Sequence, residues 1–157
     1  MKIKYHNRNQ LSPEIEAAYE AEYCSNLKDL LSGSDAISIN CPLNAQTTGL
    51  IGKAEFDAMN DGIFFVNTSR GPVLDEAAFK DALESGKIKR AGLDVFCNEP
   101  KVDEYFLNND KVTVQPHVGG WTDVSFHKCE KECFDNVRAF FETGKPISPV
   151  RDIKARM

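Results

Sequence analysis

Three side chains with acid–base or ion-pairing chemistry each stand a few residues beyond a short apolar run that is typical of a buried strand. They are Arg70 in N-T-S-R-G after Ile63–Val66, Glu99 in G-L-D-V-F-C-N-E-P after Ala91–Val95, and His117 in Q-P-H-V-G-G after Val112–Val114. In open α/β folds, ligands bind in the crevice outside the carboxyl ends of the strands. The spacing therefore predicts that these three side chains converge on one site.

The three residue types suit an anionic substrate with a carbonyl group. Arg70 can hold a carboxylate through two parallel charge-assisted hydrogen bonds, which fix its orientation. His117 can donate or accept a proton near neutral pH, and Glu99 beside it would favour the charged imidazolium and orient the ring. Such a set would protonate a keto oxygen next to a carboxylate. Since no side chain supplies hydride, the reaction requires a nicotinamide cofactor.

The elements that must position these residues alternate along the chain, which predicts a parallel sheet with flanking helices. Apolar runs and cap signals place the other expected strands at Lys2–Tyr5, Glu22–Cys24 and Ala36–Asn40. The expected helices are Pro13–Glu20, Leu27–Leu31, Lys53–Met59, Asp75–Ser85, a short one at Tyr105–Leu107, and a long one from the Thr122 cap to about Glu142. The tail from Pro146 is expected to be irregular and mobile.

These motifs, together with C-P-L-N-A-Q-T-T-G-L-I at Cys41–Ile51, resemble the carboxyl-terminal part of the D-isomer-specific 2-hydroxyacid dehydrogenases. The resemblance covers nearly the whole chain and is strongest to the glyoxylate and hydroxypyruvate reductase branch. It implies that Arg70 binds the substrate carboxylate, that His117 is the catalytic acid, and that Glu99 is the acid paired with it. The implied reaction is reversible hydride transfer between NAD(P)H and a small 2-oxo acid.

The resemblance also implies which residues contact the cofactor. Asp94 matches the residue that contacts the nicotinamide carboxamide, and the Cys41–Ile51 loop lies over the cofactor. The remaining expected contacts are Cys41, Pro42, Thr47, Thr68, Ser69, Arg70, His117 and Gly119. Asn67, Thr68 and Ser69 either bond the cofactor or shape their turn.

The residues after the first expected strand bear on the choice of cofactor. That position commonly carries an acid that binds the ribose hydroxyls of NAD, whereas an arginine accommodates the 2′-phosphate of NADP. Here His6, Asn7 and Arg8 follow the strand, with no acid among them. The sequence therefore predicts a preference for NADP over NAD.

One part of a nucleotide-binding fold has no counterpart in the sequence. No G-x-G-x-x-G occurs, and this turn would place pyrophosphate on a helix N-terminus. In the strand order 3-2-1-4-5-6, Lys2–Tyr5 would be the second strand, so the central first strand is missing. Lys2–Tyr5 and Ala36–Asn40 are then expected to present unpaired edges. Either the two halves close up, another chain supplies the strand, or the protein is marginally stable.

The expected fold is therefore an incomplete Rossmann-like α/β sheet over residues 1–145, with a tail over 146–157, as in a truncated product or a fragment. The isolated chain is expected to be weakly active or inactive. The rival interpretation is a non-catalytic relic or protein-interaction module of the same fold. Homodimer formation would depend on the missing segment. Trp121, larger than expected after the histidine motif, either packs the last helix onto the sheet or lines the substrate side.

Composition narrows the class of protein. A net charge of −5 without a basic stripe argues against nucleic-acid binding. No apolar run approaches the roughly 18 residues of a membrane span, so a cytoplasmic protein is expected. The five cysteines form no disulfide framework. Cys129 and Cys133, one helical turn apart near His127, are expected to be reduced thiols and not metal ligands.

Overall fold

The computed structural model describes residues 1–149, and the chain divides into two compact units, Met1–His117 and a second that begins at Val118. The elements in chain order are β1 (Ile3–Tyr5), α1 (Pro13–Tyr19), β2 (Ala21–Tyr23), α2 (Leu27–Ser32), β3 (Ala36–Ile39), α3 (Lys53–Ala58), β4 (Ile63–Asn67), the 3₁₀ helix η1 (Gly71–Val73), α4 (Glu76–Glu84), β5 (Ile88–Leu93), α5 (Glu104–Leu107), β6 (Val112–Val114) and α6 (Asp123–Thr143). Each unit is described by itself.

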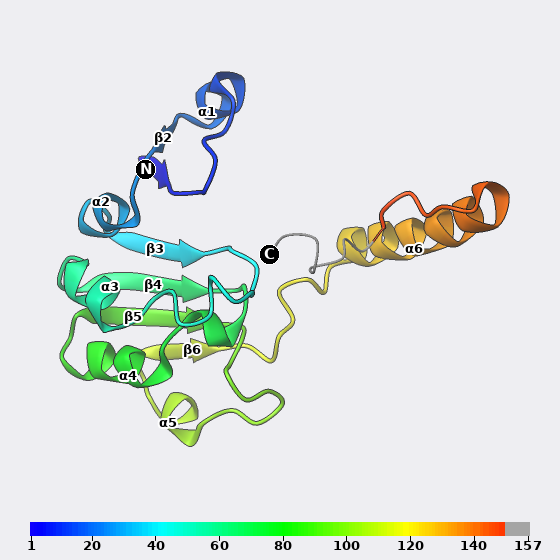
Figure 1. Cartoon of the computed structure of the whole chain (residues 1–157). Coiled ribbons are helices and arrows are strands. Elements are labelled where there is room, and N and C mark those ends of the chain that lie inside the picture. Colours follow the sequence, from blue (N-terminus) through cyan, green and yellow to red (C-terminus); the bar gives the residue numbers. More distant parts are fainter. Residues whose placement is uncertain (150–157) are drawn as a thin grey trace. The chain divides into compact units, whose positions relative to one another are not determined.

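The larger sheet of the first unit has four parallel strands in the order β3-β4-β5-β6 (Figure 1). Ile37 pairs with Phe65, Phe65 with Ala91, and Ala91 with Val112, so the ladder is continuous across all four strands. Strand and helix alternate along this part of the chain, as a parallel sheet requires. The predicted Rossmann-like α/β fold is confirmed.

One face of this sheet carries the core. Strand β4 alternates buried and exposed residues along its length, because successive side chains of a strand point to opposite faces. Its buried Phe65 lies between two helix residues, with ring centroids 5.8 Å from Phe56 of α3 and 5.4 Å from Phe79 of α4. Phe106 of α5 extends the cluster, 5.9 Å from Phe79. This aromatic cluster fixes α3, α4 and α5 against the sheet.

The opposite face is open. Phe64 and Val66 of β4 are 47% and 39% exposed, and Ala36 and Ser38 of β3 are exposed beside them. The Lys89 ammonium lies 5.7 Å from the centroid of the Phe64 ring. The four-stranded sheet is therefore covered on one side only by the described residues of this unit.

Strands β1 and β2 form a separate two-stranded parallel sheet, in which Ile3 pairs with Ala21. Helix α1 connects them and begins at Pro13, whose fixed φ and missing N–H suit the first turn of a helix. Neither β1 nor β3 has a second strand neighbour among the described residues. The predicted unpaired edges of β1 and β3 are thus present, and the two sheets do not pair with each other.

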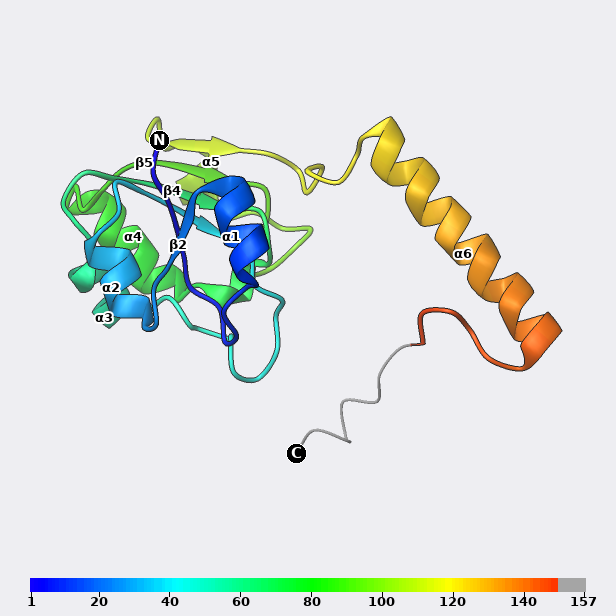
Figure 2. The same cartoon turned by 90° about the horizontal axis from the view of Figure 1, so that it is seen from above.

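The second unit contains one long helix, α6, seen as a continuous element in Figure 2. Thr122 caps it by accepting a hydrogen bond from the Ser125 amide at 3.2 Å, as predicted. Its apolar side chains are exposed, among them Phe126, Val137 and Phe140. Trp121 is 76% exposed, so its packing role stays a prediction. No helix in the described part of the chain is long and apolar enough to cross a bilayer.

Two strands are displaced from their expected bounds, and most of the other boundaries differ from the expected ones by one residue. The strand expected at Ala91–Val95 runs from Ile88 to Leu93, because Ile88 already pairs with Ile63 of β4 while Asp94 and Val95 lie beyond the ladder. The strand expected at Glu22–Cys24 begins and ends one residue earlier. Residues 146–149 form no helix or strand, and the rest of the predicted tail lies outside the described residues. The domain boundary at 145 stays a prediction.

We predict that Phe65→Ala lowers the free energy of unfolding by about 3–5 kcal/mol, because it empties the centre of the aromatic cluster. The matched control is Phe64→Ala, one residue away on the open face, which should change it by less than about 1 kcal/mol. Urea unfolding followed by circular dichroism measures both. Equal losses for the two variants would show that the core is not on the α3–α4 side.

Candidate active site

The candidate site lies at the carboxyl ends of β4, β5 and β6, where all three strands of the parallel sheet point the same way (Figure 1). Arg70 follows β4, Asp94 follows β5 directly, and His117 follows β6 after two residues. The backbone amide of Asp94 donates to the Asn67 carbonyl at 3.1 Å, which ties the end of β5 to the end of β4. The sheet thus positions the predicted residues at one edge.

Asn67 shapes the turn that carries Arg70. Its side chain is fully buried. The Asn67 Oδ1 atom accepts from the Ser69 amide at 3.0 Å and from the Ser69 hydroxyl at 2.9 Å, while Nδ2 donates to the Arg70 carbonyl at 3.1 Å. All three hydrogen bonds of the Asn67 side chain are to residues of the same turn. Of the two roles that the sequence left open, cofactor bonding and turn shaping, these bonds support turn shaping for Asn67.

Gly71 lets two loops of the site touch. A Cβ atom at Gly71 would lie 2.0 Å from the Phe96 carbonyl carbon and 2.4 Å from the Cys97 nitrogen, far inside van der Waals contact. Only glycine permits this approach. The turn carrying Arg70 is therefore held against the segment that leads to Glu99, a requirement that the sequence reasoning missed.

Glu99 and His117 form the central polar pair. The Glu99 Oε2 atom lies 2.7 Å from Nδ1 of His117, and Oε1 accepts from the Phe96 amide at 2.8 Å. His117 adopts φ = 57°, a left-handed conformation that is uncommon for a residue other than glycine. With Nδ1 bonded to the carboxylate, Nε2 is left as the ring nitrogen available for a ligand.

Electrostatics favour the charged form of Glu99. Desolvation by burial pushes its pKa upward, but this effect is outweighed by the hydrogen bonds from His117 and the Phe96 amide and by the charges of His117 and Arg70. The net result is a lowered pKa. The charge of Arg70 is the smallest of these contributions. The Arg70 side chain is exposed, and its Nη1 donates to the Ser69 carbonyl at 2.6 Å.

The loop after β3 is fixed close to the Arg70 turn. Within it, the Thr47 hydroxyl donates to the Pro42 carbonyl at 2.6 Å. The Gly49 amide donates to the Pro72 carbonyl at 2.9 Å, and the following Ile51 forms a parallel bridge with Leu74. Of its expected cofactor contacts, Cys41 is partly buried, which raises the pKa of its thiol, and Pro42 is exposed.

The other expected cofactor residues are distributed over the fold. His6, Asn7 and Arg8 follow β1 in the two-stranded sheet. There, His6 Nδ1 lies 2.8 Å from the Cys24 carbonyl, and the Asn7 carbonyl accepts from the Tyr23 hydroxyl at 3.0 Å. Asp94 is buried at the end of β5, Thr68 is exposed on the Arg70 turn, and Gly119 belongs to the second unit.

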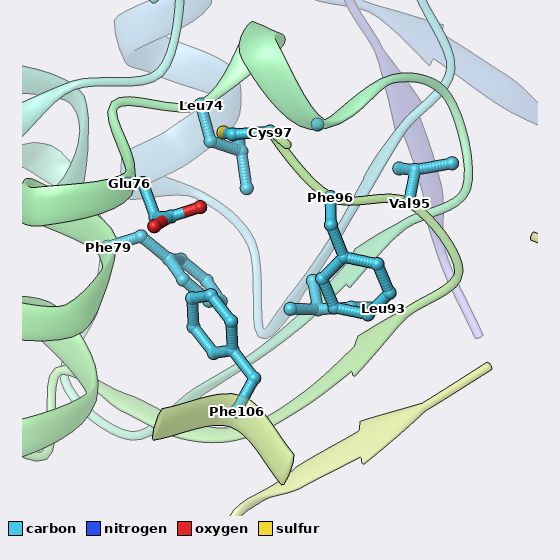
Figure 3. Close-up of a pocket in the computed structure, with 9 residues that line it drawn as sticks. Leu74, Glu76, Phe79, Leu93, Val95, Phe96, Cys97 and Phe106 are labelled. Carbon is cyan, nitrogen blue, oxygen red and sulfur yellow. The ribbon is translucent and has the colours of Figure 1, made fainter. Parts of the chain in front are cut away.

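A small apolar pocket beside Gly71 is lined by two side chains with polar groups, Glu76 and Cys97, that the sequence analysis did not single out (Figure 3). Burial and a hydrogen bond with Glu76 raise the pKa of the Cys97 thiol to about 11. Since thiolate is the reactive form, the raised pKa disfavours reaction of the Cys97 thiol at neutral pH. Lys80 pairs with Glu76 at 3.4 Å and with Asp103 at 2.6 Å, joining α4 to the segment before α5. These contacts hold the segment that carries Glu99 against α4.

Among the described residues, no group of three histidine, cysteine or acidic side chains is placed to hold a metal ion. Cys129 and Cys133 are both exposed on α6, and His127 Nδ1 lies 2.7 Å from the Asp123 carbonyl. The candidate site is therefore the group of polar side chains at the carboxyl ends of β4, β5 and β6.

The fold and these side chains together define a class of protein. It is an α/β nucleotide-binding fold with an arginine and a carboxylate–histidine pair at the ends of its strands.

Comparison with known proteins specifies the family. Residues 1–119 match the family model described as the D-isomer specific 2-hydroxyacid dehydrogenase, NAD binding domain. The dehydrogenase efuE of Hormonema carpetanum is 55% identical over 98% of this chain and 38% of its own length. A glyoxylate reductase from Paecilomyes thermophila, known from a crystal structure, superposes with a TM-score of 0.88 at 43% identity, over 96% of this chain and 45% of its own.

A third similar protein is the NADPH-dependent glyoxylate/hydroxypyruvate reductase of Sinorhizobium meliloti, solved in complex with NADP and malonate. It has a TM-score of 0.85 and 32% identity, over 95% of this chain and 45% of its own. The chain belongs to the D-isomer-specific 2-hydroxyacid dehydrogenase family, and the part of it that matches is the family's NAD-binding domain. It spans less than half the length of these three relatives.

We predict that Gly71→Ala lowers the free energy of unfolding by about 1–3 kcal/mol or more, because the added methyl group forces the Arg70 turn away from Phe96 and Cys97. In the control Gly92→Ala, the new Cβ would lie 3.8 Å from Val66 Cγ2, an ordinary contact. That variant should stay within about 0.5 kcal/mol of the parent chain in the same urea titration. A Gly71→Ala protein as stable as the Gly92→Ala control would contradict the close approach.

We also predict a pH-dependent contribution of Glu99 to stability. Because its pKa is lowered in the folded chain, its contribution is fully present above the ordinary carboxyl pKa and is lost as the pH falls through the lowered value. Glu99→Gln should therefore be less stable than the parent at pH 7, and the difference should shrink on acidification. Unfolding titrations of both proteins between pH 7 and pH 3 measure this. A difference that stays constant over this range would rule it out.

Proposed function

We propose that this chain carries the substrate-binding and acid–base residues of an NAD(P)-dependent reductase of small 2-oxo acids. The observation that carries the proposal is the 2.7 Å contact between Glu99 Oε2 and His117 Nδ1. Arg70 follows the neighbouring strand β4, and its charge helps to lower the pKa of Glu99. A carboxylate-binding cation beside an oriented imidazole matches a substrate with a carboxylate next to a carbonyl. The proposal extends to glyoxylate and hydroxypyruvate as the substrates, in keeping with the names of two similar reductases.

Each residue has a separate role in the proposed reaction. Arg70 binds the substrate carboxylate through both guanidinium nitrogens, which aims the carbonyl at His117. Protonated His117 donates from Nε2 to the carbonyl oxygen as that oxygen gains charge, and it is left as neutral imidazole until it takes a proton from water. Glu99 holds Nδ1–H and stabilises the imidazolium before transfer. A bound nicotinamide supplies the hydride to the carbonyl carbon.

The chain fits one end of such a cofactor better than the other. Asp94 is a buried carboxylate, 6% exposed, directly at the end of β5 and tied to the Arg70 turn through its own amide. It would accept a hydrogen bond from the nicotinamide carboxamide, with the β3 loop residues Cys41, Pro42 and Thr47 lying over it. The pyrophosphate is the part without a cradle here, since the sequence contains no G-x-G-x-x-G.

We propose NADP as the preferred cofactor, on the ground that Arg8 follows β1 and no acid stands beside it. A single exposed arginine next to a ribose position can pair with a 2′-phosphate. Weak or absent turnover is proposed for the chain by itself, because pyrophosphate binding needs a glycine turn. The rival proposal is an interaction module that keeps the fold without catalysis, and it is favoured by the unpaired edges of β1 and β3.

The test is a chimera in which this chain replaces the matching part of the Paecilomyes thermophila glyoxylate reductase. We expect it to reduce glyoxylate, and His117→Gln to lower kcat by about 10²- to 10⁴-fold, because the proton donor is lost. Arg70→Lys should act mainly on KM, since lysine keeps the charge and loses the planar fork. Steady-state kinetics with glyoxylate and hydroxypyruvate measure both effects.

The matched control is His127→Gln, an exposed histidine of α6 that should leave kcat and KM unchanged. In the same chimera, Arg8→Asp should shift the preference from NADPH towards NADH. A folded chimera that binds NADPH but reduces no 2-oxo acid would favour the interaction module. Full activity of the His117→Gln chimera would remove the proposed acid.

A further inference from the structure

Helix α6 carries two exposed thiols on one face. Cys129 and Cys133 stand four residues apart in this helix, which Figure 2 shows as one continuous element. Side chains at this spacing lie one above the other on a helix surface, with Cβ atoms about 5–6 Å apart. Neither cysteine takes part in the proposed reductase chemistry.

The two sulfur atoms act on each other. The pKa of Cys133 is raised, first by the charge of a thiolate at Cys129, and then by partial desolvation and by hydrogen bonding to Cys129. Interactions of this kind weaken with distance. The two thiols therefore point toward each other along the helix face, and Cys133 carries its proton at neutral pH.

The spacing of the pair decides what can join the two sulfur atoms. A disulfide needs Cβ atoms about 3.5–4.5 Å apart, which is closer than residues four apart on a helix come. One atom bonded to both sulfurs needs more room. With metal–thiolate bonds of about 2.3 Å, a linear bridge separates the sulfurs by about 4.6 Å. The helix thus disfavours an internal disulfide and suits a single bridging ion.

The absence of further ligands selects the kind of ion. Zinc in protein sites takes four ligands, and the described residues offer no group of three histidine, cysteine or acidic side chains. The nearby polar groups are already bonded. His127 Nδ1 lies 2.7 Å from the Asp123 carbonyl, and the Glu132 carboxylate accepts from the Ser148 hydroxyl at 2.8 Å.

Cu(I) fits a site of this composition. It is a soft ion that thiolate ligands select, and two thiolates in line with it complete its coordination. The expectation that these thiols bind no metal depends on the lack of further ligands, which a two-coordinate ion does not need.

We propose that Cys129 and Cys133 form a two-coordinate binding site for Cu(I) on α6. In the binding step, one copper–sulfur bond forms at each cysteine while its S–H bond breaks, and the two protons pass to water. Copper stays in the Cu(I) state, so no oxidant or reductant takes part. The site consists of residues of α6 alone and is independent of cofactor and of the Glu99–His117 pair.

The test titrates the purified, reduced chain with Cu(I) in the absence of oxygen, with the coloured Cu(I) chelator bicinchoninate as competitor. We expect one Cu(I) per chain. Native mass spectrometry should find a monomer that has gained one copper and lost two protons. X-ray absorption at the copper edge should show two sulfur neighbours.

Single substitutions identify the ligands. Cys129→Ser and Cys133→Ser should each weaken Cu(I) binding by more than about 100-fold, because loss of a group that merely orients a metal ligand already costs about 10- to 100-fold. Cys97→Ser removes a partly buried thiol of the first unit and should keep the parent affinity. Circular dichroism confirms that each variant is folded.

A matched control separates the spacing from the number of thiols. The double variant Lys131→Cys/Cys133→Ser keeps two cysteines on α6 but places them two residues apart, where side chains do not face each other. It should bind Cu(I) no more tightly than Cys133→Ser alone.

Four results would overturn the proposal. The chain takes no copper from bicinchoninate, or it binds copper as tightly after loss of either α6 cysteine. The double variant binds as tightly as the parent, or one copper joins two chains, which would make the site intermolecular. None of these readouts involves NADPH or a 2-oxo acid, so failure here leaves the proposed reductase chemistry to be judged by the chimera.

Discussion

The arrangement of the site depends on one backbone contact, the approach of Gly71 to Phe96 and Cys97. A side chain at residue 71 would overlap the Phe96 carbonyl. With glycine there, the turn after β4 and the segment after β5 lie against each other, and the charge of Arg70 is one of the effects that lower the pKa of Glu99. Glu99 in turn is held by the Phe96 amide of that same segment and orients His117. The absence of a side chain at residue 71 thus lets the segments that carry Arg70 and Glu99 pack against each other.

The core explains why this arrangement is rigid on one side. The aromatic cluster around Phe65 and Phe79 locks α3, α4 and α5 to a single face of the sheet. The segment from Phe96 to Asp103 is fastened to the same helices, because Lys80 of α4 pairs with Asp103 and the Cys97 thiol packs against Glu76. The Glu99–His117 pair is therefore attached to the well-packed side of the unit, whereas the Phe64 face lacks such support among the described residues.

The sequence could predict those features that depend on local pattern. The apolar run Ile63–Val66, the Asn26 and Thr122 caps and the glycine stops indicated most elements. The rule that ligands bind at the carboxyl ends of parallel strands predicted that Arg70, Glu99 and His117 share one edge. The early start of β5 could not be predicted, because Ile88 joins the ladder through its partner Ile63 and a register shift follows at Phe64. Gly71 was equally hidden, since only the position of Phe96 shows why a side chain cannot stand there.

In the proposed function, the acid–base pair and the residue proposed to contact the cofactor ribose belong to two different sheets. The bonds that orient Glu99 and His117 all lie within the part of the chain built on β4, β5 and β6, so this pair forms without any added strand. Arg8 instead follows β1, in a sheet that shares no ladder with β3. A dinucleotide bound as proposed would contact both parts at once, because its ribose and nicotinamide ends are joined covalently. The proposed affinity for cofactor therefore depends on both sheets, whereas the orientation of the His117 ring depends on the larger sheet alone.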